Sequence, residues 1–314
     1  MSESARRAAE HTRLRRLGYR LLPGDGFSYL LHLRPREWPI MTAHTTLGFV
    51  LALGVGATMH GTRFAALLGG LAVWVVLLNG GTLAINSAFD NDEGDIGYLD
   101  APPPPPARLA VFAFALMAAG QGIALALPRG FAIAYAICFA MSLLYSVPPV
   151  RLKAVAGADW IINMVGFGAL TPYAGWALTQ LPLSRAGAWV LGGFAPLFAA
   201  LYPLTQLYQL EEDRARGDRT LALVLGRRWS LAVSIGAVVV AFACFAKASA
   251  LSHTAARGAP ALLALGVAAA AWMVVLLPWI IRASGLSPAA HKRGMYAALG
   301  AWALTDAAVL IALR

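Results

Sequence analysis

The sequence predicts an all-α membrane protein whose helices cross the bilayer many times, and its composition and its apolar periodicity lead to that prediction. Apolar residues make up 59% of the 314 residues and charged residues only 13%, whereas an ordinary soluble domain is much less apolar. Apolar stretches of about 17 to 25 residues, the length that a helix needs to cross a bilayer, recur along almost the whole chain. We therefore expect one integral membrane domain, residues 37–314.

Nine apolar stretches qualify as membrane spans, because each has a suitable length and is bounded by charge, Pro or Gly. The expected spans are 38–57, 64–88, 107–127, 130–148, 159–180, 187–208, 229–250, 259–281 and 293–313. The preceding segment, residues 1–36, is basic, and its start lacks the continuous apolar core of a signal peptide. We expect it to form an amphipathic segment at the cytoplasmic face of the membrane.

Lys and Arg are concentrated on one side of this predicted topology, and such residues mark the cytoplasmic side. Only six of the 25 fall on the other side, namely Arg63, Arg129, Arg185, Lys247, Arg257 and Arg314. The asymmetry places the amino terminus in the cytoplasm, and we expect insertion in a cell inner membrane. The net charge of +10 then reflects topology and attraction to membrane lipid, so a nucleic-acid partner is not expected.

Acidic residues gather in two short segments that follow the second and sixth spans, so both segments open on the cytoplasmic side. Nine of the 15 acids lie there, at Asp90, Asp92, Glu93, Asp95, Asp100, Glu211, Glu212, Asp213 and Asp218. Charged groups close to a membrane are costly, so their pairing on one side indicates a functional site. The opposite loops carry no such clusters, which disfavours the alternative that the acids only solvate helix ends.

Helical geometry gives each acidic segment a polar face. At 100° per residue, Asn86, Asp90 and Glu93 lie within about 60° of one another. Asp95 would point away in a continuous helix, but Gly94 allows the chain to turn it back toward the same pocket. A second polar face is formed by Tyr202, Gln206, Gln209 and Asp213.

Paired carboxylates predict a magnesium site, because Mg²⁺ prefers oxygen ligands and bridges protein carboxylates to substrate phosphates. The expected metal ligands are Asp90, Glu93, Asp95, Gln209 and Asp213. The stretch YSVPPVRLK, residues 145–153, places Arg151 and Lys153 on the same membrane side as both clusters. We expect these two cations to bind a diphosphate, with Arg214 as a weaker candidate.

These motifs resemble those of the UbiA superfamily of intramembrane prenyltransferases, and the resemblance covers most of the chain. The matching stretches, in order, are LHLRPREWPIMTAHTTLGFVLA (31–52), NSAFD (86–90), YSVPPVRLK (145–153) and YQLEEDRARGDRTLALVLG (208–226). The resemblance implies nine helices around a central cavity, Mg²⁺, an isoprenyl diphosphate and a lipophilic acceptor, either aromatic or lipid. It also implies that Asn86, Asp90 and Asp213 bind metal or diphosphate.

The chain departs from the family pattern at several positions. Gly94 stands where the first motif usually has its second aspartate, and Asp95 is one residue further on. The run APPPPPAR, residues 101–108, replaces the usual continuation. Gln206 and Gln209 stand where the second motif often has aspartates, and a neutral amide oxygen is a weaker Mg²⁺ ligand.

The expected reaction begins when Mg²⁺ and basic residues stabilise the charge that develops on the diphosphate as the allylic carbon–oxygen bond breaks. A dry cavity then protects the allylic cation until an acceptor attacks. Catalytic roles are expected for Asn86, Asp90 and Asp213, and Tyr145 and Tyr202 would position the acceptor or stabilise the cation. Two alternatives remain at this stage, a membrane terpene cyclase acting on the prenyl diphosphate alone and, more remotely, a transporter.

Overall fold

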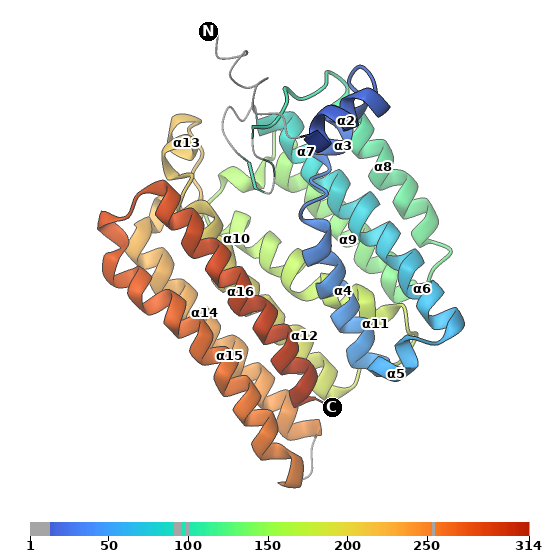
Figure 1. The fold of residues 1–314 in the computed structure, drawn as a ribbon, viewed down its shortest axis with the longest axis vertical. Coiled ribbons are helices and arrows are strands. Elements are labelled where there is room, and N and C mark those ends of the chain that lie inside the picture. Colours follow the sequence, from blue (N-terminus) through green and yellow to red (C-terminus); the bar gives the residue numbers. More distant parts are fainter. Residues whose placement is uncertain (1–12, 91–95, 98, 100, 253–254, 314) are drawn as a thin grey trace.

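The computed structural model describes residues 13–90, 96, 97, 99, 101–252 and 255–313, which form helices joined by turns and loops (Figure 1). No strand occurs within these ranges, where the β-structure consists of isolated bridges such as that between Val155 and Arg219. The predicted all-helical fold is therefore confirmed.

The amino-terminal half begins with two short helices and continues with the first expected spans. The elements are α2 (Arg13–Leu21), α3 (Gly26–His32), α4 (Trp38–Leu53), α5 (Val55–Thr58), α6 (Gly61–Leu71), the π-helix η1 (Ala72–Gly80), α7 (Gly81–Asp90), α8 (Leu109–Ala124) and α9 (Arg129–Ser146). Pro39 lies in the first turn of α4, where its missing N–H costs no hydrogen bond. The helix ends before residue 57 because Gly54 has φ 101°, a conformation that favours glycine.

The carboxyl-terminal half contains the longest helices. Its elements are η2 (Leu152–Ala154), α10 (Ala158–Asn163), the π-helix η3 (Met164–Leu170), α11 (Thr171–Ala177), α12 (Arg185–Gln206), α13 (Leu210–Ala215), α14 (Leu221–Ser252), α15 (Ala255–Arg282), η4 (Ala283–Gly285) and α16 (Pro288–Ala312). Ser184 and Ser287 cap α12 and α16 by accepting hydrogen bonds from backbone N–H groups three residues on. Gly226, with φ 73°, breaks α14 near its start.

Six helices in the described part of the chain are long and apolar enough to cross a bilayer. They are Gly61–Asp90, Arg129–Ser146, Arg185–Gln206, Leu221–Ser252, Gly258–Gly285 and Pro288–Ala312. Helices α4 and α8 are apolar but shorter, and the fifth expected span is assembled from α10, η3 and α11. The membrane fold is thus confirmed, whereas the number of nine spans stays a prediction.

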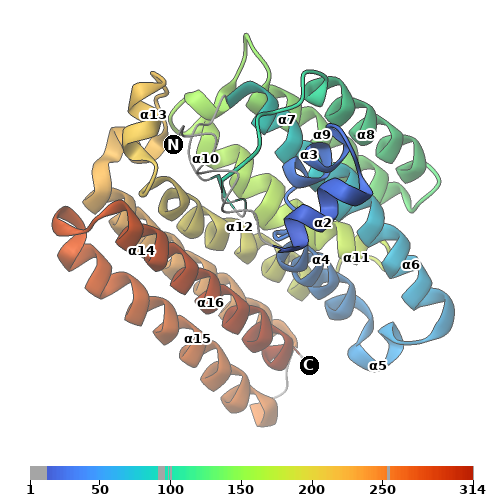
Figure 2. The ribbon, with the colours of Figure 1, turned by 45° about the horizontal axis from the view of Figure 1, so that its top comes forward.

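The helices pack into two groups, and each group has its own apolar core. Phe194 and Trp272 belong to a core that α12, α14, α15 and α16 share, whereas Trp74 and Tyr135 belong to one shared by η1, α7, α8, α9 and α11. Figures 1 and 2 show the two groups side by side, with α4 and α10 between them. Side chains from both groups line one central cavity of about 310 Å³.

Helix α4 is held against α11 by a close approach of their backbones. A Cβ atom on Gly48 would lie 1.7 Å from the carbonyl oxygen of Pro172, and one on Gly175 would lie 1.8 Å from that of Thr45. Small residues allow such contacts between membrane helices. The contact fixes the face that α4 presents to the cavity.

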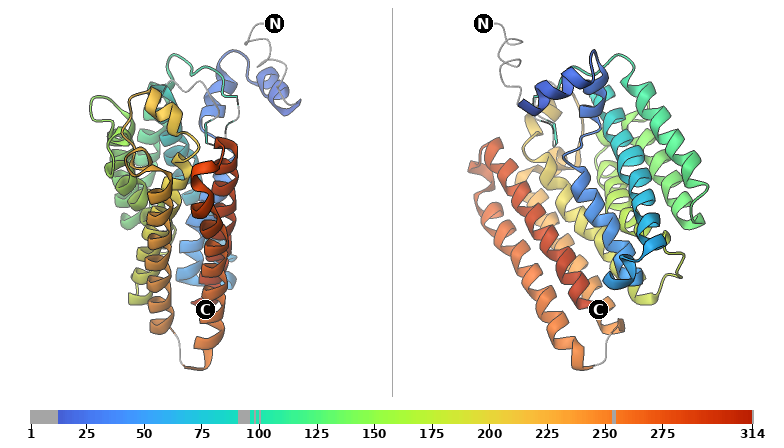
Figure 3. Two further views of the ribbon diagram at one scale, coloured as in Figure 1. Left: turned by 90° about the vertical axis from the view of Figure 1, so that its left-hand side faces the viewer. Right: turned by 45° about the vertical axis from the view of Figure 1, so that its right-hand side comes forward.

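The segments predicted to carry the site come together at one end of the bundle. Helix α7 ends there, α13 lies there, and the short helices α2 and α3 lie at the same end (Figure 3). The segments that precede α7 and α13 belong to different helix groups. The site therefore lies where the two groups meet.

Candidate active site

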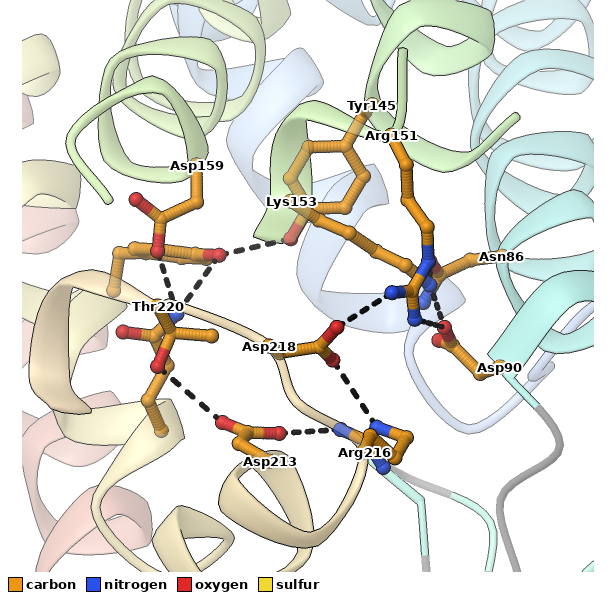
Figure 4. A network of polar contacts seen from close by, with 12 residues as sticks. Asn86, Asp90, Tyr145, Arg151, Lys153, Asp159, Asp213, Arg216, Asp218 and Thr220 are labelled. Carbon is orange, nitrogen blue, oxygen red and sulfur yellow. Dashed lines mark hydrogen bonds and ion pairs between the residues drawn. The ribbon is translucent and has the colours of Figure 1, made fainter. Parts of the chain in front are cut away.

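Seven of the predicted site residues line the central cavity. They are Asn86, Asp90, Tyr145, Lys153, Tyr202, Gln209 and Asp213. Arg151 lies beside them and contacts Asp90. Most of their polar side chains take part in the polar contacts drawn in Figure 4, so the structure brings most of the predicted residues together.

Helix α7 supplies the first half of the site. Asn86 and Asp90 lie one turn apart, as their spacing predicts, and Asp90 is the last residue of the helix. Asn86 Oδ1 accepts hydrogen bonds from Lys153 Nζ at 2.8 Å and from Ser146 Oγ at 3.2 Å. The Asp90 side chain is buried and forms an ion pair with Lys153.

The basic loop between α9 and α10 connects the two acidic clusters. The Arg151 guanidinium donates to Asp218 Oδ1 at 2.5 Å, and its other terminal nitrogen lies 3.5 Å from Asp90 Oδ1. Lys153 is 7% exposed, and this burial lowers the pKa of its amine to about 7, against the opposing attraction of Asp218. The loop therefore carries the two cations that join the halves of the site.

The second acidic cluster is ordered by Arg216. This side chain pairs with Asp213 Oδ1 and donates through Nε to Asp218 Oδ2 at 3.1 Å. Gly217, with φ 75°, allows the chain to reverse between α13 and Asp218. Thr220 donates to Asp213 Oδ2 at 3.5 Å, so both carboxylates are held at the cavity mouth.

A backbone contact joins this cluster to the basic loop. The N–H of Arg219 donates to the carbonyl of Ala154 at 3.1 Å, as part of a parallel bridge with Val155. The pairing does not depend on side-chain identity. It sets the position of Arg151 relative to Asp218 through the main chain.

A neutral network lies beside the charged one. The hydroxyls of Tyr145 and Tyr202 are 2.8 Å apart, and Gln206 Nε2 donates both to Tyr202 at 3.1 Å and to Asp159 Oδ2 at 2.9 Å. Asp159 Oδ2 also accepts from the N–H of Leu221, the first residue of α14. Gln206 Oε1 in turn accepts a hydrogen bond from the backbone of α14. The Gln206 side chain therefore links α12 to α14.

The predicted continuous face from Tyr202 to Asp213 is wrong in detail. Helix α12 ends at Gln206 and α13 begins at Leu210, so Gln209 lies in the break with φ −109°. Tyr202 and Gln206 lie one turn apart, whereas Gln209 and Asp213 reach the cavity from a different segment. The polar stripe is formed by two helices rather than by one.

Among the predicted site residues that the structure describes, Arg214 lies outside the network. Arg214 is exposed on α13 and lines a separate cavity with Arg227 and Arg228. Since Asp213 turns toward the central cavity, its neighbour on a helix points elsewhere. Glu93 and Asp95 lie outside the described residues.

Sequence reasoning missed several polar residues of the site. Arg216 was not among the predicted site residues, and Asp218 was counted in the acidic segment without a role in the site, although the alternation of charges in DRARGD was an available signal. Asp159 accepts a hydrogen bond from the start of α14, and it was not among the predicted site residues. Arg34 and Glu37 line the cavity ahead of α4, and only their presence in the opening motif pointed to them.

The donor set fits a magnesium ion by its chemistry. Asp90 and Asp213 present hard carboxylate oxygens from opposite sides of the cavity mouth. Asp90 Oδ1 is buried without a regular hydrogen bond in the described part of the chain, and cations lie beside it. Asp90 lies on α7 and Asp213 on α13, so these carboxylates would hold the ion as two half-sites. Among the described residues, no three His, Cys, Asp or Glu side chains form a compact metal-binding group.

The chain is similar in sequence to a known protein family and to two archaeal proteins. The model of the UbiA prenyltransferase family matches residues 43–300. A lycopene elongase/hydratase from Haloferax volcanii is 28% identical over 234 residues, which cover 70% of this chain and 73% of that protein. The lycopene elongase/hydratase of Halobacterium salinarum is 29% identical over 233 residues, or 70% of this chain and 79% of that one.

The fold is similar to that of solved structures. A UbiA homologue from Archaeoglobus fulgidus, bound to DMAPP and Mg²⁺, matches with a TM-score of 0.63 at 19% identity, over 90% of this chain and 99% of that chain. A structure of digeranylgeranylglyceryl phosphate synthase matches with a TM-score of 0.65 at 14% identity, over 91% and 97%. The family match extends through the segments that build the site, and the chain belongs to the UbiA prenyltransferase family as an integral membrane prenyltransferase.

Proposed function

We propose that the protein uses Mg²⁺ to ionise an isoprenyl diphosphate and transfers the prenyl group to a lipophilic acceptor, releasing diphosphate. The observation that carries this proposal is the convergence of Asp90, Asp213 and the basic loop at one end of an apolar cavity. An isoprenyl diphosphate has matching parts, an anionic head and an apolar tail. The relative bound to DMAPP and Mg²⁺ supports this class of substrate.

The head of the substrate would lie among the charged residues at the mouth. Asp90 and Asp213 would hold Mg²⁺, which supplies charge neutralisation at the diphosphate oxygens. Arg151 and Lys153 would donate to the diphosphate, and Asn86 orients Lys153 through their hydrogen bond. Gln209, which lines the same cavity, and Glu93 and Asp95 remain predicted metal ligands.

The tail and the acceptor would lie in the apolar part of the cavity. Aromatic rings line it there, including Trp74, Phe167, Phe198 and Trp302. Such rings attract cations by their faces and keep water out, so they protect an allylic cation from hydrolysis. The hydrogen-bonded pair of Tyr145 and Tyr202 lies between the rings and the charged mouth and would position the acceptor.

The charge asymmetry of the loops supports a cytoplasmic mouth. Arg151 and Lys153 lie between α9 and α10, and Arg216 follows α13, which lies at the end of the bundle where α2 and α3 also lie (Figure 1). Because Lys and Arg mark the cytoplasmic side, we place this end and the amino terminus in the cytoplasm. The protein would then lie in a cell inner membrane.

The test is a product analysis with purified protein in proteoliposomes. Mg²⁺ and dimethylallyl, geranyl or geranylgeranyl diphosphate are supplied with and without an acceptor, either lycopene or a hydroxylated aromatic compound. We expect diphosphate release and a prenylated product that requires the acceptor. A cyclic hydrocarbon formed from the prenyl diphosphate alone would instead establish a terpene cyclase, and solute flux without diphosphate release would establish a transporter.

A further inference from the structure

A second polar patch lies on the inner side of the proposed diphosphate site. Glu37, just before α4, and Asn79, in η1, both line the cavity and are 8% and 4% exposed. The Asn79 amide lies beside the Glu37 carboxylate, although neither amide atom makes a hydrogen bond of regular geometry in the described part of the chain. The patch is thus buried, polar and incompletely satisfied.

The depth of this patch follows from the helix that carries it. Asn86, Thr82 and Asn79 all line the cavity along one continuous helical segment. Seven residues separate Asn79 from Asn86, which corresponds to about 10 Å along a helix. An acceptor that attacks the allylic carbon from the apolar side would lie at this level, between the diphosphate site and the aromatic rings.

The π-helix η1 contributes to the position of the patch. It spans Ala72–Gly80 and places Trp74, Leu78 and Asn79 on the cavity wall. π-Helical turns widen a helix locally and occur frequently at functional sites. Asn79 is the last but one residue of this element, so the amide reaches the cavity where the helix returns to α-geometry.

Glu37 differs from the other carboxylates of the cavity. Four carboxylates line it within the described residues, and Asp90, Asp213 and Asp218 are ion-paired at the mouth. The chain just before Glu37 packs against η1, where a Cβ atom on Gly80 would lie 3.4 Å from Leu33 Cβ, so Glu37 lies at the level of Asn79, with the charge of Arg34 nearby. The Arg34 guanidinium donates to Ser87 at 3.1 Å, on the side toward the mouth. At this level the Glu37 carboxylate would lie on the apolar side of the reacting carbon, away from the diphosphate and its metal.

We propose that Glu37 accepts the proton that must leave after the allylic cation is captured, and that Asn79 positions the carboxylate. This inference rests on the proposed function. When the allylic carbon bonds to an unsaturated acceptor, a new cation forms on the acceptor. The adjacent C–H bond then breaks, its electron pair restores the double bond, and the proton passes to Glu37. Without an acceptor, the same carboxylate takes a proton from the prenyl cation and leaves a hydrocarbon.

The test compares the fate of the cation in variants. Proteoliposomes receive geranyl diphosphate and Mg²⁺ alone, and the ratio of eliminated hydrocarbon to geraniol-type alcohol is measured by mass spectrometry together with diphosphate release. We expect Glu37→Gln to lower the ratio by more than about tenfold, since a positioned base contributes on the order of 10²- to 10⁴-fold, while diphosphate release changes by less than about threefold. Glu37→Asp, which keeps a carboxylate, should recover part of the ratio.

Matched variants separate a chemical role from a structural one. Arg36→Gln changes an exposed charge in the same segment and should leave both readouts unchanged. Asn79→Leu should lower the ratio less than Glu37→Gln, because it removes only the positioning amide. An unchanged ratio in Glu37→Gln overturns the inference, whereas absence of diphosphate release from the unmodified protein overturns the proposed function itself.

Discussion

Lys153 donates a hydrogen bond of 2.8 Å to Asn86 Oδ1, although 67 residues separate the two in the chain. The same amine is ion-paired with Asp90, one turn further along α7. The contact joins the first acidic segment to the basic loop. It also holds the amine at the place where the proposed diphosphate would bind.

Replacement of Lys153 by Met should weaken binding of geranyl diphosphate strongly. A hydrogen bond to a charged group contributes about 1.5 to 3 kcal/mol, so we expect the KM for diphosphate release to rise about 10- to 100-fold. Lys153→Arg should retain part of the affinity. Lys247→Met, which removes an exposed Lys near the end of α14, is the matched control and should have no effect.

Asp90→Asn and Asp213→Asn should each reduce diphosphate release by more than about 100-fold, because an amide is a weaker Mg²⁺ ligand than a carboxylate. Removal of Mg²⁺ with EDTA should have the same effect on the unmodified protein, and added Mg²⁺ should reverse it. Asp25→Asn, at an exposed position before α3, is the control. Full activity in either site variant would contradict the two half-sites.

Asp159→Ala should destabilise the protein without acting on the charged site directly. The buried carboxylate accepts from Gln206 and from the N–H groups of Leu221 and Gly157. Its removal leaves buried hydrogen-bond donors unpaired, so we expect the free energy of unfolding to fall by about 2 to 4 kcal/mol. Thermal unfolding in detergent measures the effect, and an unchanged Tm would show that these bonds contribute little.

Glu37 should make stability depend on pH. Burial raises the pKa of its carboxyl to about 7 in the folded protein, against the opposing charge of Arg34, compared with 4.5 in the unfolded chain. Below pH 4.5 both states hold the proton. Between pH 4.5 and 7 the unfolded chain releases it while the folded protein retains it, so folding becomes less favourable as pH rises.

Glu37→Gln should remove this dependence. The variant should be more stable than the unmodified protein at pH 8, by up to about 3 kcal/mol, and equally stable near pH 4. Such a gain is typical of positions where function is kept at the expense of stability. Tm values measured in detergent at both pH values test this. Equal Tm values of the variant and the unmodified protein at pH 8 would show that burial does not perturb the pKa of the carboxyl.

The part of the site that α7 and the basic loop supply was predictable from sequence. Asn86 and Asp90 lie one helical turn apart within a regular helix, so periodicity placed both on the cavity face. Lys153 was predicted because the order of spans fixes which loops share a membrane side. These features depend on spacing and topology alone.

The remaining features depend on long-range contacts or on breaks in helical geometry. Arg216 enters the site because α13 ends at Ala215 and Gly217 reverses the chain, whereas Arg214 was the arginine predicted from this segment. Asp159 binds the start of another helix, and nothing in its own neighbourhood indicates that partner. Helical spacing also assumes 3.6 residues per turn, which fails across π-helices such as η1.

The backbone bridge between Ala154 and Arg219 bears on how this enzyme can be recombined with its relatives. Because a hydrogen bond between main-chain atoms joins the two loops, replacing one loop alone with that of a relative would pair a non-native backbone with the remaining native loop. Segments 147–157 and 213–220 should therefore be replaced together in a chimera. A chimera that receives both should keep the spacing of Arg151 and Asp218, and one that receives a single segment should lose it.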